Sequence, residues 1–347
     1  MVKALRSVRS RKQLARMRKE AEDPLMLAGK TVKVAVLDDY QSVALEMADW
    51  SVLGEKADVA VFRDHLSEPT QIIARLQPFE VVCVMRERTP LPRSILEQLP
   101  NLKLICSTGP RNASIDMAAA KERGITVCGT QYTPHGAAEF TWALILAMVR
   151  NLPAESASLR AGGWQTSIGG DLEGKTIGLL GLGRLGSASA SVARAFGMKI
   201  IAWSQNLTRE TAEQRGAQLV SKEEIFRDSD IVSIHLVLSG RTRGIVGAAE
   251  IALMKSTAYL VNTSRGPLVD EAALIDALKN RAIAGAVLDV YDTEPLPQPH
   301  PFRSLNNVLA TPHIGYVTRD TYKMFYCDTV ENISAWLSGK PVRVANG

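Results

Sequence analysis

Short apolar segments alternate with longer amphipathic segments along most of the chain from residue 32 onwards. The apolar segments are nearly continuous in Val, Ile, Leu and Cys, which is typical of parallel strands covered on both faces. Helical crossovers between such strands build a doubly wound α/β domain. The strands predicted in the first series are Val32–Leu37, Val59–Phe62, Val81–Met85, Leu102–Cys106 and Thr126–Cys128. The helices predicted between them include Gln71–Leu76, Arg93–Gln98 and Asp116–Arg123.

A second series of strands follows a long predicted helix, Ala137 to about Arg160, and a glycine-rich break that ends at Gly170. Its predicted strands are Thr176–Leu180, Lys199–Trp203, Ile231–Leu236, Ala258–Val261, Gly285–Val290 and Val308–Ala310. The amphipathic segment Thr321–Leu337 predicts a terminal helix that ends before Gly339. We therefore expect two α/β domains, in which residues 134–316 are inserted into a domain formed by residues 31–133 and 317–347.

Length and composition agree with a two-domain globular protein. The chain has 347 residues, of which 46% are apolar, and domains average about 150 residues. The longest apolar stretch, Phe140–Val149, has about half the length that spans a bilayer. The four cysteines form no CxxC pair, and no cluster of residues has the spacing of metal ligands. We expect a soluble protein with reduced cysteines, no metal site and no contact with membranes.

The first twenty residues are strongly basic and contribute +7 to the net charge of +5, which leaves −2 for the remaining residues. A nearly neutral body argues against a nucleic-acid-binding face. Three interpretations of residues 1–30 stay open: a solvated arm or a start codon assigned too early, a mitochondrial presequence, or an arm that contacts nucleic acid or a membrane surface. The expected location is the cytoplasm, with mitochondrial import as the alternative.

The segment from Thr176 to Gly186 contains the glycine spacing GxGxxG at Gly181, Gly183 and Gly186. An apolar strand precedes these glycines and a predicted helix begins on them, which is the context that a dinucleotide-binding turn requires. The N-terminus of the helix, at Arg184 and Leu185, then offers free N–H groups to the cofactor's phosphates.

The identity of the dinucleotide depends on the end of the next strand, where NAD-binding proteins usually carry an Asp or Glu for the ribose hydroxyls. The sequence there is Trp-Ser-Gln-Asn-Leu-Thr-Arg, residues 203–209, and contains no carboxylate. Without that charge nothing repels a 2′-phosphate, and Ser204, Asn206 and Arg209 can supply hydrogen bonds and a cation. The sequence slightly favours NADP and leaves NAD, or the use of both, open.

Three further strands end in polar residues. Ser264 and Arg265 follow one strand, Asp289 and Glu294 follow the next, and His313 follows the last. Ligands of open α/β sheets bind at the carboxyl ends of the strands, so we expect these side chains to converge on one site. An Arg, a Glu and a His at such an edge suit the reduction of a carbonyl group.

The chain resembles the D-isomer-specific 2-hydroxyacid dehydrogenases over about residues 33–345. The matching segments are the glycine turn 181–186, Ala138–Thr141, Met254-Lys255, Val261–Gly266, Val269-Asp270, Leu288–Val290, Glu294-Pro295 and Thr311–Gly315. The resemblance implies a Rossmann domain inserted into a flavodoxin-like substrate domain, with Arg265, Glu294 and His313 as catalytic residues and Asp289 near the nicotinamide. The further residues expected at the cofactor are Thr141, Thr263 and His235, while His65, His135 and His300 are expected to be structural or solvated.

The chemistry of these three residue types supports their implied roles. The guanidinium of Arg265 offers a planar pair of donors to a substrate carboxylate. His313 must be protonated to deliver a proton to the keto oxygen as hydride arrives from the cofactor. A carboxylate at Glu294 beside the imidazole favours the imidazolium and orients the ring.

The loops expected to face the substrate depart from the family pattern. The family usually has a glycine-rich loop after the strand at Leu102, and here Thr108 and Gly109 are followed by Pro110, which lacks an N–H donor, and by Arg111. Arg111 can bind a second acidic group of the substrate or pair with a local acid. Arg86 and Arg88 lie in the other loop that is expected to face the substrate, and Arg88 is the stronger candidate.

We expect an oxidoreductase that transfers hydride between NAD(P)H and a small 2-oxo acid or D-2-hydroxy acid, similar to glyoxylate and hydroxypyruvate reductases. The alternative is an NAD(H)-sensing, corepressor-like protein with little turnover on the same fold. The expected partner besides the substrate is a second copy of the chain, since relatives form dimers through the helix that corresponds to Glu139–Asn151.

Overall fold

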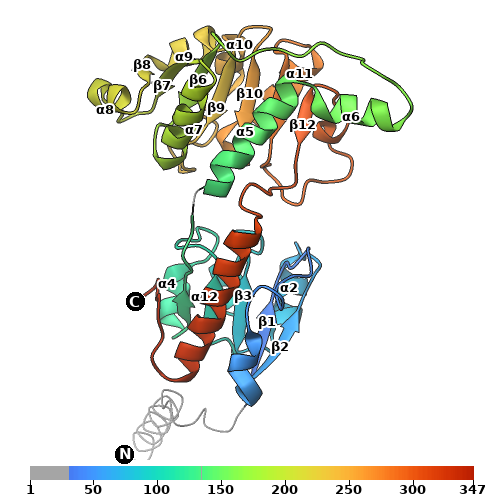
Figure 1. Cartoon of the computed structure of the whole chain (residues 1–347). Coiled ribbons are helices and arrows are strands. Elements are labelled where there is room, and N and C mark those ends of the chain that lie inside the picture. Colours follow the sequence, from blue (N-terminus) through green and yellow to red (C-terminus); the bar gives the residue numbers. More distant parts are fainter. Residues whose placement is uncertain (1–30, 134) are drawn as a thin grey trace, which may run out of the picture. The chain divides into compact units, whose positions relative to one another are not determined.

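The computed structural model of the protein describes residues 31–133 and 135–347. The chain forms two compact units, one that includes the described residues up to Tyr132 together with Arg319–Gly347, and one that comprises Thr133–Thr318. Figure 1 shows that each unit is a sheet flanked by helices. The basic segment and the expectations made for residues 1–30 lie outside the described residues.

The first unit contains a five-stranded parallel sheet in the order β2-β1-β3-β4-β5. This is the flavodoxin-like strand order. Its strands are β1 (Val32–Val36), β2 (Ala57–Val61), β3 (Val81–Val84), β4 (Leu104–Ser107) and β5 (Thr126–Cys128). Its helices are η2 (Trp50–Lys56), α2 (Pro69–Leu76), α3 (Arg93–Leu96), α4 (Met117–Glu122) and α12 (Arg319–Leu337).

Both faces of this sheet are covered, which explains the unbroken apolar character of its strands. All residues of β3 and β4 are buried, and α2, α3 and α4 contribute side chains to the core on one face. On β3, β4 and β5, Cys83 lies opposite Cys106 and Cys106 lies opposite Cys128 in the strand register. All three thiols are buried and free, as predicted, and the fourth thiol, that of Cys327 on α12, is exposed and also free.

The second unit contains a seven-stranded parallel sheet in the order β12-β11-β10-β9-β6-β7-β8. The strand order reverses beside β6, as in Rossmann folds, so the prediction of two doubly wound domains is confirmed. The strands are β6 (Thr176–Leu180), β7 (Lys199–Trp203), β8 (Gln218–Leu219), β9 (Ile231–Ile234), β10 (Tyr259–Asn262), β11 (Gly285–Leu288) and β12 (Val308–Ala310). The short strand β8 was not predicted.

Helices on both faces of the second sheet enclose two apolar cores. One core receives side chains from α9 (Lys222–Asp228), α10 (Ala248–Ala252) and α11 (Glu271–Lys279). The other receives side chains from α5 (His135–Val149), α7 (Arg184–Ala195) and α8 (Arg209–Gln214). The short 3-10 helices η3 (Gly266–Leu268) and η4 (Pro301–Arg303) complete the unit.

The single long helix predicted from Ala137 to Arg160 is wrong, because the structure divides it into α5 and α6 (Leu152–Arg160). Asn151 between them has a left-handed backbone with φ 53°. Pro153 lies in the first turn of α6, where its missing N–H is tolerated, whereas in a continuous helix its ring would clash with the carbonyl of Val149. No residue of α6 is buried within the described chain.

Within residues 31–133 and 135–347, no helix combines the length and the apolar character needed to cross a membrane. The same residues contain no group of three or more His, Cys, Asp or Glu side chains arranged to hold a metal ion.

Candidate active site

The glycine-rich turn after β6 has the geometry that a dinucleotide requires. Gly181 has φ 98°, and a Cβ atom at this position would lie 2.7 Å from the carbonyl oxygen of His235. A Cβ atom at Gly186 would lie 2.1 Å from the carbonyl oxygen of Gly181, so α7 can approach the turn only with glycine there. At Gly183, by contrast, a Cβ atom would meet nothing within 4 Å. The first and third glycines therefore serve packing, while the second leaves open space on the side from which a phosphate approaches.

The helix that follows this turn begins without a side-chain cap in the described structure. Gly183 is the N-cap residue of α7, and it has no side chain to accept a hydrogen bond from the first turn. The backbone N–H groups of Arg184 and Leu185 therefore have no side-chain acceptor, and the positive end of the helix dipole is directed at the open turn. This chain fits a pyrophosphate group at the position that the sequence predicted.

The neighbouring strand β7 ends beside the same turn, since the N–H of Gly181 donates to the carbonyl oxygen of Trp203 over 2.8 Å. Ser204 is half-buried, whereas Asn206 and Arg209 are exposed. The hydroxyl of Thr208 accepts from the N–H of Thr211 and caps α8. The end of β7 that carries Ser204 thus lies beside the turn.

His235 directly follows β9, and its backbone carbonyl lies against Gly181 of the turn. Its Nε2 lies 3.0 Å from the hydroxyl of Ser233, and burial lowers the pKa of the imidazole to about 4. His235 is therefore neutral at pH 7 and packs against the turn through its own backbone carbonyl. Its contact with the cofactor stays a prediction.

His313 and Glu294 form a close pair at the carboxyl edge of the second sheet. Nδ1 of His313 lies 2.6 Å from Oε2 of Glu294, and the other oxygen of Glu294 accepts the N–H of Tyr291 over 3.0 Å. His313 has a left-handed backbone with φ 52°, and its N–H donates to the carbonyl oxygen of Thr311. The rings of His313 and Tyr316 pack edge to face, with their centroids 5.6 Å apart. These contacts leave Nε2 as the ring nitrogen that points away from the carboxylate.

Asp289 holds the loop that carries His313. One of its carboxylate oxygens accepts from the hydroxyl of Thr311 over 2.7 Å and from the N–H of Ile314 over 2.9 Å. The other oxygen accepts from the N–H of Gly315 over 2.9 Å. Asp289 is only 1% exposed, and burial raises the pKa of its carboxyl above the usual value. The sequence placed Asp289 near the nicotinamide, and the structure shows a positioning residue for the histidine loop.

Arg265 follows β10, which is the neighbour of β11 in the sheet. Its Nη1 donates to the carbonyl oxygen of Ser264 over 2.7 Å, and its own carbonyl accepts from the side chain of Asn262. A Cβ atom at Gly266 would lie 2.1 Å from the carbonyl carbon of Tyr291, so the loop of Arg265 packs directly on the loop of Glu294. Arg265, Glu294 and His313 therefore follow three adjacent strands and lie at one edge, as predicted from the sequence.

Two predicted cofactor residues meet each other near this edge. The hydroxyls of Thr141, on α5, and Thr263, after β10, lie 2.7 Å apart. The Thr141 hydroxyl also donates to the carbonyl oxygen of Ala137, one turn earlier in α5. This contact ties α5 to the carboxyl edge of the second sheet.

In the first unit, Arg86 lies against the loop after β4. Its backbone N–H donates to the hydroxyl of Thr108, and its Nη1 donates to the carbonyl oxygen of Thr108 over 3.2 Å. A Cβ atom at Gly109 would lie 1.8 Å from this Nη1, so only glycine accommodates the guanidinium there. Arg111 is exposed and forms no ion pair with any described residue. Pairing with a local acid, one of the two interpretations of Arg111, is thus not seen.

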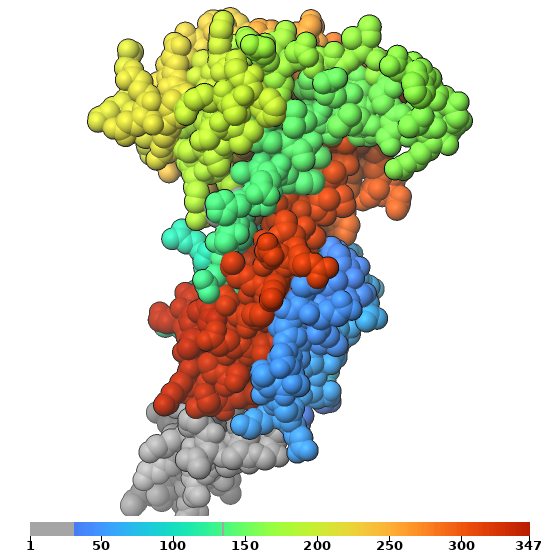
Figure 2. All heavy atoms as spheres, in the orientation of Figure 1, coloured from blue at the N-terminus to red at the C-terminus, as the bar shows by residue number. Residues whose placement is uncertain are grey.

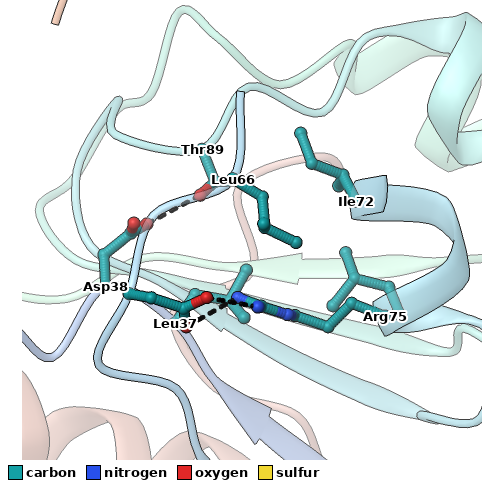
Figure 3. Close-up of a pocket in the computed structure, with 8 residues that line it drawn as sticks. Leu37, Asp38, Leu66, Ile72, Arg75 and Thr89 are labelled. Atoms are coloured by element: carbon teal, nitrogen blue, oxygen red, sulfur yellow. Dashed lines mark hydrogen bonds and ion pairs between the residues drawn. The ribbon is translucent and has the colours of Figure 1, made fainter. Parts of the chain in front are cut away.

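Arg88 belongs to a buried network around Asp38 that the sequence analysis missed. Its Nη1 donates to the carbonyl oxygen of Asp38, and its guanidinium lies 4.5 Å from the centre of the Tyr40 ring. The Asp38 carboxylate accepts from Thr89 and lies 3.0 Å from Nδ1 of His65. Figure 3 shows Asp38 and Thr89 joined beside a small hollow lined by Leu66 and Ile72. Asp38 lies one residue beyond the predicted strand, a position where sequence analysis can look for such a partner.

Residues 142–315 match the family model of the D-isomer-specific 2-hydroxyacid dehydrogenase NAD-binding domain. The chain is also 41% identical to a glyoxylate reductase of Aeropyrum pernix over 256 residues, which are 71% of this chain and 76% of that protein. This chain belongs to the D-isomer-specific 2-hydroxyacid dehydrogenases. The family resemblance inferred from the sequence is confirmed.

Two further comparisons cover most of this dehydrogenase. A hydroxypyruvate reductase of Blautia hydrogenotrophica is 30% identical over 325 residues, which are 91% of this chain and 100% of that protein. The crystal structure of a phosphoglycerate oxidoreductase from Vibrio cholerae O395 is similar with a TM-score of 0.85 and 39% identity, and the match covers 89% of this chain and all of that one. The dehydrogenase is thus an oxidoreductase of D-2-hydroxy acids and 2-oxo acids with an NAD(H)-binding domain.

Proposed function

We propose that Arg265, Glu294 and His313 are the catalytic residues with which this dehydrogenase reduces a small 2-oxo acid to the D-2-hydroxy acid. The observation that carries the proposal is the 2.6 Å contact between Glu294 and Nδ1 of His313. This contact presents Nε2 of the imidazolium as the proton donor. When bound, the nicotinamide supplies the hydride for carbon 2 of the substrate, and the proton from His313 completes the hydroxyl group.

Arg265 is suited to hold the substrate carboxylate and to polarise the keto oxygen. The guanidinium carries five N–H donors in one plane, one of which bonds to the carbonyl oxygen of Ser264, and a carboxylate can be bound by two parallel donors. Because Arg265 and His313 belong to loops after β10 and β12, the two strands that flank β11, we propose that the acid group and the keto group of one short substrate are bound together.

We propose a small substrate of the glyoxylate or hydroxypyruvate type, which is supported by the names of the relatives at 41% and 30% identity. In the first unit, Thr108, Gly109 and Arg88 line the loops proposed to contact the substrate. The exposed Arg111 guanidinium is free to bind a second acidic group of the substrate. Arg111 therefore extends the proposed substrate range to 2-oxo acids that carry another anionic group.

The cofactor end of the site supports NADP(H) in preference to NAD(H). Ser204 stands where a ribose-binding carboxylate is usual, and no acid follows it before Glu210. The proposed cofactor contacts comprise the turn Gly181, Gly183, Arg184, Leu185 and Gly186, the ribose residues Ser204, Asn206 and Arg209, and Thr141, His235, Thr263 and Asp289.

We also propose that the dehydrogenase is a homodimer that covers α6 and the segment after it. Trp164 is 74% exposed and Ile168 is 97% exposed, and Leu152 and Leu159 of α6 also face solvent. Figure 1 shows α6 and the following loop at the margin of the second unit, and Figure 2 shows the same light-green segment at the surface. An isolated nine-residue helix is marginal in water, so a second copy is the simplest cover for these apolar side chains.

The buried free thiols of Cys83, Cys106 and Cys128 support a reducing compartment, in agreement with the expected cytoplasmic location.

The decisive experiment is a panel of 2-oxo acids, with glyoxylate, hydroxypyruvate, phenylpyruvate and 2-oxo diacids, run with NADH and with NADPH. We expect turnover of small 2-oxo acids and faster turnover with NADPH. Binding of the dinucleotide without turnover of any substrate would contradict the proposal and favour a sensing protein.

A further inference from the structure

Arg215 lies against the glycine-rich turn, although it is 33 residues away in the sequence from Leu182, the residue of the turn that it contacts. Its Nη1 donates to the carbonyl oxygen of Leu182, which lies between Gly181 and Gly183. Arg209 is the last cation in the segment that directly follows β7, so Arg215 lies beyond the positions where the sequence predicts a ribose-binding residue. The tertiary structure therefore adds a guanidinium at the margin of the dinucleotide site.

The backbone around Arg215 is held in place by several contacts. Its N–H donates to the carbonyl oxygen of Ala212 over 3.1 Å, which ends α8, and its own carbonyl accepts from the side chain of Arg194 over 3.2 Å. Gly216 then reverses the chain with φ 71°. The strand β8 follows and pairs with β7. This reversal returns the chain along β7 and places Arg215 beside the turn.

The positive charge of the Arg215 guanidinium has no acidic partner among the described residues. No ion pair connects Arg215 to an acid of the described chain, and the nearby Glu210 accepts a hydrogen bond from Gln214. Only one of the five N–H donors of the Arg215 guanidinium is used, in the bond to Leu182. The remaining donors suit the planar, two-point recognition of a phosphate.

The adenosine ribose of a dinucleotide lies between the glycine-rich turn and the end of the second strand in a Rossmann fold. In this protein the glycine-rich turn touches the end of β7, because the N–H of Gly181 donates to the carbonyl oxygen of Trp203. Arg215 contacts Leu182, the residue next to Gly181. We propose that Arg215 binds the 2′-phosphate of NADP(H), with the Ser204 hydroxyl as a second donor, and thereby sets the preference for NADP(H). This inference deepens the proposed function and rests on its assignment of the dinucleotide site.

The test measures binding without turnover. The affinities of adenosine 2′,5′-bisphosphate and adenosine 5′-monophosphate are determined by calorimetry for the intact protein and for Arg215→Gln. We expect the intact protein to bind the bisphosphate more tightly, and Arg215→Gln to weaken bisphosphate binding by about tenfold or more relative to the monophosphate, as loss of a charged hydrogen bond predicts. The ratio of kcat/KM for NADPH to that for NADH falls by a similar factor.

Lys199→Gln is the matched control, because it removes one exposed positive charge at the opposite end of the same strand, β7. It keeps the preference for the bisphosphate. Arg215→Lys keeps the charge but not the two-point geometry, so it retains part of the preference, and it provides a second test if Arg215→Gln does not fold.

Two results would overturn the inference about Arg215. One is equal affinity of the intact protein for the two nucleotides, and the other is an unchanged preference in both Arg215 variants. In either case turnover of 2-oxo acids with NADH would leave the proposed dehydrogenase function intact. Loss of all turnover with both cofactors in the intact protein would instead count against the function itself.

Discussion

One carboxylate oxygen of Glu294 lies 2.6 Å from Nδ1 of His313, and the other accepts a hydrogen bond from the backbone N–H of Tyr291. The carboxylate is thus fixed to its own loop while it orients the imidazole. The opposite ring nitrogen, Nε2, points away from the carboxylate and is the proposed proton donor.

We expect His313→Ala to lower the rate of 2-oxo acid reduction by about 100-fold or more, which is the usual contribution of a positioned general acid. Glu294→Gln keeps the shape but loses the charge, and it lowers kcat by about tenfold or more. If Glu294 acts through His313, the double variant is no slower than His313→Ala alone. Steady-state reduction rates measure this, and near-normal turnover of His313→Ala would refute the role of the histidine.

Arg265→Lys mainly weakens substrate binding. Lysine retains the positive charge but loses the planar pair of donors that fits a carboxylate. We expect KM for the 2-oxo acid to rise about tenfold or more, with a smaller change in KM for the dinucleotide. Unchanged KM and kcat for the variant would exclude a carboxylate clamp at this residue.

Asp289→Asn tests whether this carboxylate positions the histidine loop. An amide supplies one acceptor oxygen in place of two and directs an N–H group at a backbone N–H group. We expect the free energy of unfolding to fall by about 1–3 kcal/mol and kcat to fall while KM for the 2-oxo acid stays nearly constant. Thr311→Val removes only one of the three donors to Asp289 and has a smaller effect on both quantities. A rise in KM alone would contradict the positioning role.

His235 makes the stability of the second unit depend on pH. Its pKa is lowered to about 4 in the folded protein, whereas an unfolded histidine has a pKa of about 6.5. Between these values the unfolded chain binds more protons, so the contribution of His235 to stability is lost as the pH falls from about 6.5 to 4. Urea unfolding at several pH values measures how the free energy of unfolding changes with pH. In His235→Gln, the loss of this free energy between pH 6.5 and 4 is smaller by on the order of 1–3 kcal/mol. An identical slope in the variant would show that another group causes the dependence.

The reactivity of the four thiols follows their burial. Burial raises the pKa of Cys128 to about 11, and the neighbouring thiol of Cys83, followed by burial, raises the pKa of Cys106. Since the thiolate is the reactive form, we expect a thiol reagent at pH 8 to modify Cys327 in the native protein and all four cysteines after denaturation. Cys327→Ser therefore removes the rapid reaction of the native protein. Rapid modification of two or more thiols in the native protein would contradict this assignment.

The fold class and the loops that carry the proposed chemistry could be predicted from local sequence patterns. Buried parallel strands require apolar residues on both faces, so their positions can be recognised from local composition, and β6 and β7 have the predicted bounds. The glycine spacing and the polar residues after β10, β11 and β12 are local signals as well. The proposed catalytic residues Arg265, Glu294 and His313 can therefore be recognised from the sequence alone.

The contacts between side chains that are distant in the sequence could not be predicted and are seen in the folded chain alone. The bonds from Asp289 to the loop of His313 span 22 to 26 residues, and the bond from Arg215 to Leu182 spans 33. No local pattern encodes such contacts, because they depend on the register of strands and on how loops after different strands turn. The break between α5 and α6 was likewise not predicted, because the residues on both sides of Asn151 have a helical pattern and the left-handed backbone of this one residue interrupts the helix. Local composition specifies which elements form, whereas the close packing of those elements selects the polar partners at their ends.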